Sequence, residues 1–214
     1  MKLASKLLMI AAMGATALTA IAGSASAQET YAVTKYEYNR ADGADTHGLT
    51  FGLSGKYNSG FAYDLSLMSA DSKGEGTLGA DVELSYTIGG IAGPVALYET
   101  RKTGGLETDQ FLLGVVGGTS LHGFDLTGKA LVDVDKSDTY RLSLGADYAV
   151  SKDLVLIGEL THFANDAAPK MNMLEVGARY NLVGNLHADV GAHYGREHGG
   201  AEKTGLHLGI GFKF

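Results

Sequence analysis

Apolar and polar residues alternate one by one through most of the chain, in runs of about ten residues. In the run from Leu78 to Ile88, the residues Leu, Ala, Val, Leu, Tyr and Ile alternate with Gly, Asp, Glu, Ser and Thr. The same period of two occurs from Leu174 to Leu182 and from Leu186 to Tyr194. It predicts β-strands with one apolar and one polar face, because successive side chains of a strand point to opposite sides. We therefore expect an all-β fold.

Turn signals separate these runs, among them Asn58-Ser59-Gly60 and Val183-Gly184-Asn185. Runs and turns together predict twelve strands in a single domain. Ten strands is the alternative, because the fifth, sixth and ninth runs alternate less regularly. The predicted strands cover residues 30–39, 48–57, 61–70, 77–88, 94–101, 108–118, 123–134, 139–149, 154–163, 171–182, 186–195 and 204–214.

The N-terminal segment has the features of a secretory signal peptide. It begins with a basic stretch, continues with an apolar run from Leu7 to Ala22, and ends in Ala25-Ser26-Ala27, which fits a cleavage site. The apolar run is short and rich in small residues, so a membrane anchor is the weaker interpretation. We expect a signal peptide over residues 1–27 and a β domain over residues 28–214 that acts outside the cytoplasm.

Composition argues against several classes of function. Lys2 and Lys6 lie in the predicted signal peptide, so 15 of the 17 Lys and Arg residues remain against all 24 Asp and Glu, a net charge of −9. An acidic chain of this kind is not expected to bind nucleic acid. The chain contains no Cys, which excludes disulfides and Cys-based metal sites. A secreted chain without disulfides needs another source of stability, and a closed barrel supplies one because it leaves no strand edge unpaired.

The alternation fits a soluble β-sandwich, whose apolar face packs inward, and also a membrane barrel, whose apolar face meets lipid. Four features favour the barrel. The runs have the length that crosses a bilayer, the opposite face is rich in small and polar residues, and the signal peptide implies export. Aromatic residues also stand near strand ends on the apolar face, as in interfacial girdles. They are Tyr38, Tyr57, Phe61, Tyr86, Tyr98, Phe111, Phe124, Tyr148, Tyr180, Tyr194 and Phe212.

The C-terminal stretch GLHLGIGFKF resembles the last strand of bacterial outer-membrane β-barrels of porin type, which typically ends in Phe. The matching residues are His207, Gly209, Phe212 and Phe214. The resemblance implies that this strand is the signal read by the outer-membrane insertion machinery. It also implies a barrel in the outer-membrane lipid with both termini in the periplasm. Small twelve-stranded members include channels for acidic oligosaccharides, a phospholipase and a lipid A deacylase, and the chain is most similar in size to the narrow channels.

On this interpretation the polar face lines the lumen, where ten acidic residues meet six basic ones. A lumen of net negative potential favours cations, unlike the basic lumens that the resemblance implies for acidic-oligosaccharide channels. Alternatively, these charges pair across strands and only fill the barrel. The predicted pore-lining residues are Glu83, Asp125, Lys129, Arg141, Asp147, Glu175 and Arg179. The other charged residues of the face are Lys35, Glu37, Lys56, Asp64, Asp81, Asp133, Glu159, Asp189 and Lys213.

Two histidines also fall on the predicted lumen face. If the last hairpin is centred on Gly200, His193 lies opposite His207, with Glu197 and His198 at the mouth. Such a group could bind a divalent metal or sense pH. Histidines that only form hydrogen bonds are the stronger interpretation, since two metal ligands without a third are a weak signal. We expect no bound metal and no cofactor.

A hydrolase is the least supported function. Phospholipase-type barrels place Ser and His on the outer face with Asn nearby, but the run that carries His162 and Asn165 contains no Ser. Protease-type barrels need acidic pairs and a His at the rim, and acids are common in any surface loop. The candidates for that rim are Asp71, Asp135, Asp138, Asp166 and His198. We expect a non-enzymatic channel that passes small hydrophilic solutes or ions by diffusion, with some preference for cations; a closed surface barrel is the alternative.

Overall fold

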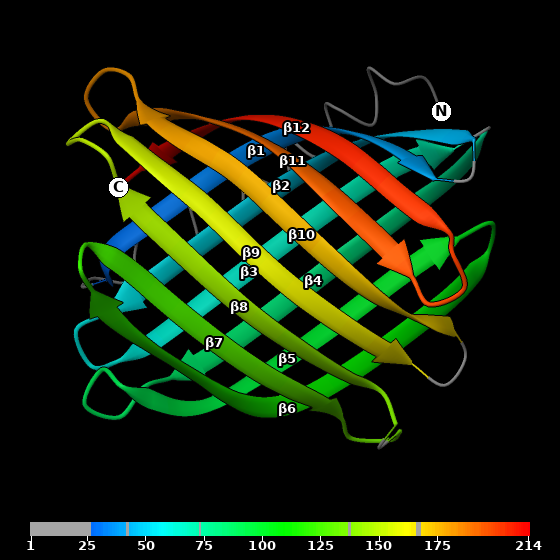
Figure 1. Cartoon of the computed structure of the whole chain (residues 1–214), viewed down its shortest axis with the longest axis horizontal. Helices are drawn as coiled ribbons and strands as arrows, with labels where there is room; N and C mark the ends of the chain where they lie inside the picture. The colour runs from blue at the N-terminus through cyan, green and yellow to red at the C-terminus, as the bar shows by residue number, and fades with distance from the viewer. Residues whose placement is uncertain (1–26, 42, 73, 137, 166–167) are drawn as a thin grey trace.

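The computed structural model describes residues 27–41, 43–72, 74–136, 138–165 and 168–214. They form one antiparallel sheet of twelve strands in sequence order, closed by pairing of the first strand with the last (Figure 1). The strands are β1 (Ala27–Ala41), β2 (Ala44–Tyr57), β3 (Phe61–Ser72), β4 (Glu75–Tyr86), β5 (Ala92–Thr103), β6 (Leu106–Leu121), β7 (Phe124–Asp133), β8 (Tyr140–Ala149), β9 (Leu154–Asn165), β10 (Ala168–Asn181), β11 (Leu186–Glu197) and β12 (Glu202–Lys213).

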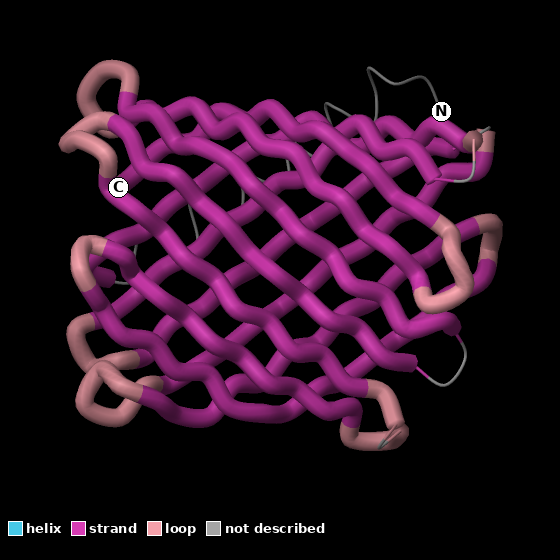
Figure 2. Tube along the Cα trace, viewed as in Figure 1, coloured by secondary structure: helices cyan, strands magenta, loops and turns pink. Residues whose placement is uncertain are grey.

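The predicted closed barrel of twelve strands is confirmed, and the ten-strand alternative is wrong. Strands and short connections alternate around the wall, with the loops at its two ends (Figure 2). Several strands run past the predicted ranges at the end opposite the C-terminus, because backbone pairing continues beyond the last apolar residue. Apart from Ala27, the first residue of β1, the predicted signal peptide lies outside the described residues. In the described part of the chain, no helix has the length and apolar character needed to cross a membrane.

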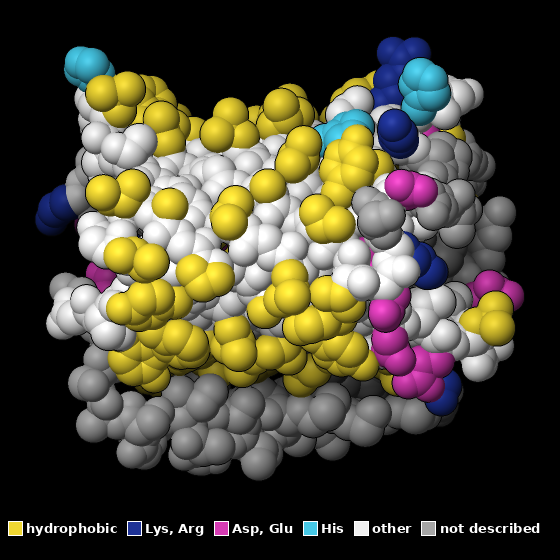
Figure 3. Space-filling model, turned by 90° about the horizontal axis from the view of Figure 1, so that it is seen from below, with side chains coloured by type: hydrophobic (Ala, Val, Ile, Leu, Met, Phe, Trp, Pro, Cys, Tyr) yellow, Lys and Arg dark blue, Asp and Glu magenta, His cyan; other side chains and the backbone are white. Residues whose placement is uncertain are grey.

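Most of the large apolar side chains on the alternating strands point out of the barrel. On β12, Leu206, Leu208 and Ile210 are about 60% exposed, while Gly205, His207 and Gly209 between them are buried. Figure 3 shows apolar side chains spread over the barrel wall in that view, with acidic side chains gathered towards one end. This is the reverse of a soluble sandwich, in which the apolar faces of two sheets are buried against each other. An apolar outer wall is the surface that a bilayer requires of a barrel.

Aromatic side chains mark both edges of the outer wall. At the end of the C-terminus, Phe124 stacks on Tyr148 with ring centroids 4.6 Å apart, and Phe212 meets Phe214 edge to face at 5.1 Å. At the opposite end, tyrosine hydroxyls donate hydrogen bonds to carboxylates of the hairpins. The pairs are Tyr38 with Asp45 at 2.9 Å, Tyr98 with Asp109 at 3.0 Å, and Tyr194 with Glu202 at 2.9 Å. The predicted girdle residues thus lie where an amphipathic ring meets both lipid and water.

Candidate functional site

The candidate site is the lumen. All seven predicted pore-lining residues belong to the inward-facing rows of their strands, because each alternates with outward apolar residues. Glu83, for example, lies between the exposed Val82 and Leu84. Position on the inner face does not by itself make a residue part of a solute path, so their contacts decide what each can do.

One ion pair crosses the inside of the barrel. The Lys129 Nζ on β7 donates a hydrogen bond to the Glu83 Oε1 on β4 at 2.7 Å. The two strands are not neighbours, since β5 and β6 lie between them. Both side chains are partly shielded, with 25% and 20% of their surface exposed. The pair therefore spans a sector of the lumen and narrows it there.

A second ion pair crosses the next sector. The Arg141 Nη2 on β8 donates to the Glu99 Oε2 on β5 at 2.7 Å, across β6 and β7. The Arg141 guanidinium also lies 4.9 Å from the centroid of the Phe163 ring, a cation–π contact that fixes its direction. Glu99 is missing from the predicted lumen face, because its strand alternates poorly. Its position between the outward-facing Tyr98 and Thr100 is the signal that could have identified it.

Under these two ion pairs lies an apolar patch that faces into the barrel. It consists of Val95, Leu97, Leu112 and Leu131, whose exposures are 1–5%, with Val116 packed against them. The strand register places Leu97 beside Glu83 and Leu131 beside Arg141. The assumption that only polar residues face the lumen is therefore wrong in this sector. The register also places Lys129 opposite Val116, so the patch lies beside the strand positions of Lys129 and Arg141.

Most other inward bases are also neutralised. The Arg101 Nη2 donates to the Asp81 Oδ2 at 2.9 Å, and the Arg179 Nε donates to the Asp189 Oδ1 at 2.8 Å. Lys213 and Lys203 pair with Glu29 and Glu197 at 2.7 and 3.0 Å. Among the described residues, the predicted lumen bases that form no ion pair are Lys35 and Lys56.

Several inward carboxylates lie beside one another instead of beside a base. Asp125 on β7 is directly opposite Asp147 on β8, and Glu159 on β9 is directly opposite Glu175 on β10. Asp125, Asp147 and Glu159 are exposed although they face inward. Asp125 and Asp147 lie next to Phe124 and Tyr148 at the end of the barrel, whereas Glu159 lies in the middle of β9, so solvent reaches this side of the lumen at Glu159. Within the described residues, none of these three carboxylates has a basic side chain within 4 Å. We call Asp125, Asp147, Glu159 and Glu175 the acidic wall.

The predicted pairing of the two lumen histidines is wrong. His193 lies opposite Gly205, and His207 lies opposite Gly191, because the last hairpin is centred on Gly199. A Cβ on Gly205 would collide with the His193 ring and with the Asn39 side chain. Glycine opposite each imidazole gives it room, which the predicted register would not.

The histidines also show no metal centre. The His207 Nδ1 is 3.9 Å from the Glu175 Oε1, beyond hydrogen-bonding distance. In the part of the chain that the structure describes, no group of three or more His, Asp or Glu side chains is placed to hold a metal ion. Glu197 is bound to Lys203, and His198 lies outside the barrel in a separate pocket. The weaker alternative, a metal or pH-sensing group, is therefore not assembled among these residues.

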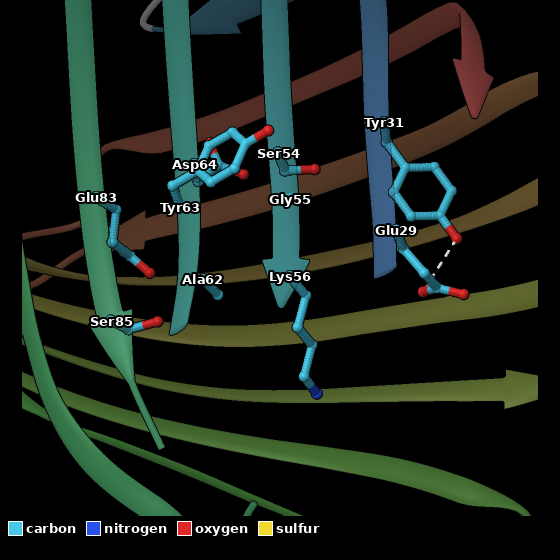
Figure 4. Close-up of a pocket in the computed structure, with 10 residues that line it drawn as sticks. All are labelled: Glu29, Tyr31, Ser54, Gly55, Lys56, Ala62, Tyr63, Asp64, Glu83 and Ser85. Atoms are coloured by element: carbon cyan, nitrogen blue, oxygen red, sulfur yellow. Dashed lines mark hydrogen bonds between the residues drawn. The ribbon is translucent and has the colours of Figure 1, made fainter. Parts of the chain in front are cut away.

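Cavities approach the two ion pairs from opposite ends of the barrel. The cavity at the end where β1 begins and β12 ends measures about 330 Å³ and reaches Asp64 and Glu83 (Figure 4). In it, Glu29 and Lys56 stand near the mouth, one from β1 and the other from β2. The cavity at the opposite end, where β5 finishes and β6 begins, measures about 400 Å³ and reaches Glu99 and Arg141. Each cavity is thus lined by at least one member of a cross-lumen ion pair.

The last strand has the geometry expected of an outer-membrane signal strand. Gly209 and His207 face inward, whereas Phe212 and Phe214 face outward with 42% and 55% of their surface exposed. The Phe214 amide donates to the Thr30 carbonyl of β1 at 2.8 Å, so the chain pairs with the first strand to its final residue. Recognition of His207, Gly209, Phe212 and Phe214 by the outer-membrane insertion machinery remains a prediction.

The residues considered for hydrolysis do not assemble with a nucleophile. The His162 Nδ1 on the outer face is 2.8 Å from the Asn172 Oδ1, and no Ser of the described residues takes part in that contact. Asp71 and Asp138 lie in separate hairpins, and Asp166 is outside the described residues.

No protein-family model matches the sequence, and no curated protein matches it significantly. Solved structures share the fold. The KdgM porin is 16% identical, with 85% of this chain and 99% of the porin covered and a TM-score of 0.59. The NanC porin is 11% identical, with coverages of 86% and 100% and a TM-score of 0.62. The translocator domain of the autotransporter NalP from Neisseria meningitidis is 14% identical, with 98% of each chain covered and a TM-score of 0.54. The chain thus has the fold of small outer-membrane β-barrels.

Proposed function

We propose that this chain is a bacterial outer-membrane channel through which small hydrophilic solutes diffuse passively, with a weak preference for cations. The acidic wall carries the proposal, since three of its four carboxylates face inward, are exposed to solvent and have no basic partner among the described residues. Fixed negative charges along a narrow aqueous path raise the local concentration of cations and lower that of anions. The predicted signal peptide and the apolar outer wall support the outer-membrane location.

The path we propose is eccentric. The cross-lumen pairs Lys129–Glu83 and Arg141–Glu99 and the apolar patch beneath them occupy the sector of β4–β8. Solutes would therefore pass on the side of the acidic wall, guided by its carboxylates. Glu83, Lys129 and Arg141 set the width of this path, whereas Asp125, Asp147 and Glu175 set its charge. Arg179 is bound to Asp189 and contributes little free charge.

The solute class differs from that of one structural relative. KdgM has been captured in complex with a disordered oligogalacturonate, a polymer of carboxylate sugars. The lumen of the present chain carries more carboxylates than bases, and most of the bases are already paired. We therefore propose neutral or cationic solutes for this channel and not acidic oligosaccharides.

The reversal potential in a planar bilayer under a KCl gradient tests both conduction and charge preference. We expect discrete conductance steps and a reversal potential whose sign corresponds to cation preference. Replacing Glu159 and Glu175 by Gln should move that potential towards the value of a non-selective pore. A folded, heat-modifiable barrel that shows no conductance steps would instead support the closed surface barrel, for which the cross-lumen ion pairs are the observation in favour.

A further inference from the structure

A pocket of about 330 Å³ lies on the outside of the barrel, at the end where β9 and β11 finish and β10 begins. We call this end of the barrel the hairpin end. Its nitrogen-bearing lining side chains come from three neighbouring strands and the last hairpin. They are His162, Lys170, Asn172, Arg196 and His198. This pocket is separate from the lumen and takes no part in the function proposed above.

The pocket begins where the apolar outer wall ends. Leu160, Leu174 and Tyr194 are outward-facing and 41–51% exposed. Two residues further along the same rows, towards the hairpin end, stand His162, Asn172 and Arg196. The strand register aligns these three across β9, β10 and β11. At this level the outer face therefore changes from apolar to hydrogen-bond-donating side chains.

Hydrogen bonds hold part of this pocket in place. The His162 Nδ1 and the Asn172 Oδ1 are 2.8 Å apart, and the His198 amide donates to the Lys170 carbonyl at 2.7 Å. The second contact ties the last hairpin to β10. A site held by backbone pairing and a side-chain bond loses less freedom when it takes up a ligand than an open loop does.

The charge of the pocket differs from that of the neighbouring rim. Among the described residues, no carboxylate lies within 4 Å of the Lys170 ammonium or the Arg196 guanidinium. Glu197 also lines the pocket but pairs with Lys203 at 3.0 Å. Glu202 is opposite Arg196 in the register, and it accepts the Tyr194 hydroxyl at 2.9 Å. By contrast, Arg40 at the rim of β1 has a carboxylate, that of Asp45, at 3.8 Å.

We propose that this pocket binds the phosphate group of an anionic lipid in the outer leaflet, with the lipid's acyl chains along Leu160 and Leu174. Arg and Lys side chains beside an apolar surface recognise phosphate headgroups by charge-assisted hydrogen bonds, and the Asn172 amide nitrogen can add a donor. The position of the pocket in the outer leaflet rests on the proposed membrane location, with both termini in the periplasm. The binding itself is independent of conduction.

Native mass spectrometry of the detergent-solubilised barrel tests the proposal. The probe is a diphosphorylated, acylated glucosamine disaccharide, compared with the same lipid without its phosphates. We expect the phosphorylated lipid to bind at least about tenfold more tightly. The double variant Lys170→Gln/Arg196→Gln should lose about tenfold in affinity for it, and the charge-preserving variant Lys170→Arg/Arg196→Lys should retain most of the affinity.

The matched control is Arg40→Gln/Lys102→Gln, which removes the same charge from the same end of the barrel outside the pocket. It should bind the phosphorylated lipid like the unmodified chain. Equal loss of lipid affinity in Lys170→Gln/Arg196→Gln and in the control Arg40→Gln/Lys102→Gln would overturn the proposal. Equal binding of the two lipids by the unmodified chain would overturn it as well. Displacement of the lipid by millimolar inorganic phosphate alone would overturn the lipid as the occupant. Single-channel conductance of the pocket variant should remain unchanged, so failure of this proposal and failure of the channel proposal can be told apart.

Discussion

Replacing Lys129 by Met should increase the cation preference of the channel. Met keeps an unbranched stem at a position opposite Val116 but removes the charge that neutralises Glu83. The Glu83 carboxylate then lies free at the narrow part of the path, directly opposite Asp64 on β3. One uncompensated negative charge is thereby added to the constriction.

The size of the effect follows from Coulomb's law. An ion that passes about 5 Å from Glu83 in a water-like medium gains or loses about 0.8 kcal/mol, and screening at about 0.1 M salt lowers this to about 0.5 kcal/mol. A cation is attracted and an anion repelled by that amount, so the difference between them is about 1 kcal/mol. The cation-to-anion permeability ratio should therefore rise about fivefold, which a reversal-potential measurement in a KCl gradient resolves.

The reverse variant supplies the matched control. Glu83→Gln leaves Lys129 unpaired and should lower the permeability ratio by a similar factor. The double variant Lys129→Met/Glu83→Gln should return it close to the original value, because each removed charge offsets the other. If both single variants leave the reversal potential unchanged, or shift it in the same direction, the ion pair does not face the conducting path and the reasoning fails.

Three further predictions address Leu112 in the apolar patch, Gly205 opposite His193, and the last residue, Phe214. Leu112→Ala removes a side chain that is 1% exposed and should lower the free energy of unfolding by about 2–4 kcal/mol in urea titrations in detergent, whereas Leu113→Ala on the outer face should have a smaller effect there. Gly205→Val should impair assembly, because its side chain would meet His193 and Asn39, and heat-modifiability on gels would show this; normal assembly would contradict the register. Deletion of Phe214 should reduce the yield of inserted barrel more than the conductance of the barrels that do insert, and an undiminished yield would refute its part in the insertion signal.

The fold could be predicted from the sequence because the period of two is a local property. Leu206, Leu208 and Ile210 point outward in any register that keeps the strand paired, and their alternation with small residues is visible in the sequence. The register of a hairpin is less local. In the β11–β12 hairpin, the observed register places the His193 ring where Gly205 has no side chain, six residues beyond the centre of the hairpin. A prediction from turn position alone was therefore wrong.

The cross-lumen contacts lay outside what a local pattern can show. Lys129 and Glu83 are 46 residues apart and sit on strands that are not neighbours, so neither periodicity nor strand pairing brings them together. The apolar patch does have a signal in the sequence. Leu112 and Leu113 are adjacent and apolar, which a half-polar strand does not explain. Where both faces of a strand are apolar, the inner one must be covered, and here two ion pairs cover it.

The two sides of the lumen therefore pose opposite electrostatic problems. On the side of β4–β8, each cross-lumen carboxylate has its own cation, and the apolar patch beneath excludes water. On the acidic wall, like charges stand directly opposite one another, an arrangement that destabilises a sheet unless solvent or counterions screen it. The exposure of Asp125, Asp147 and Glu159 supplies that screening, since Asp125 and Asp147 meet water at the end of the barrel and Glu159 meets it in the middle of β9. A fully plugged lumen would remove the water around Glu159 and leave its pair with Glu175 uncompensated. The acidic wall is thus easier to reconcile with a wet path along β7–β10 than with a closed barrel, and cations are the mobile charges that such a path would hold.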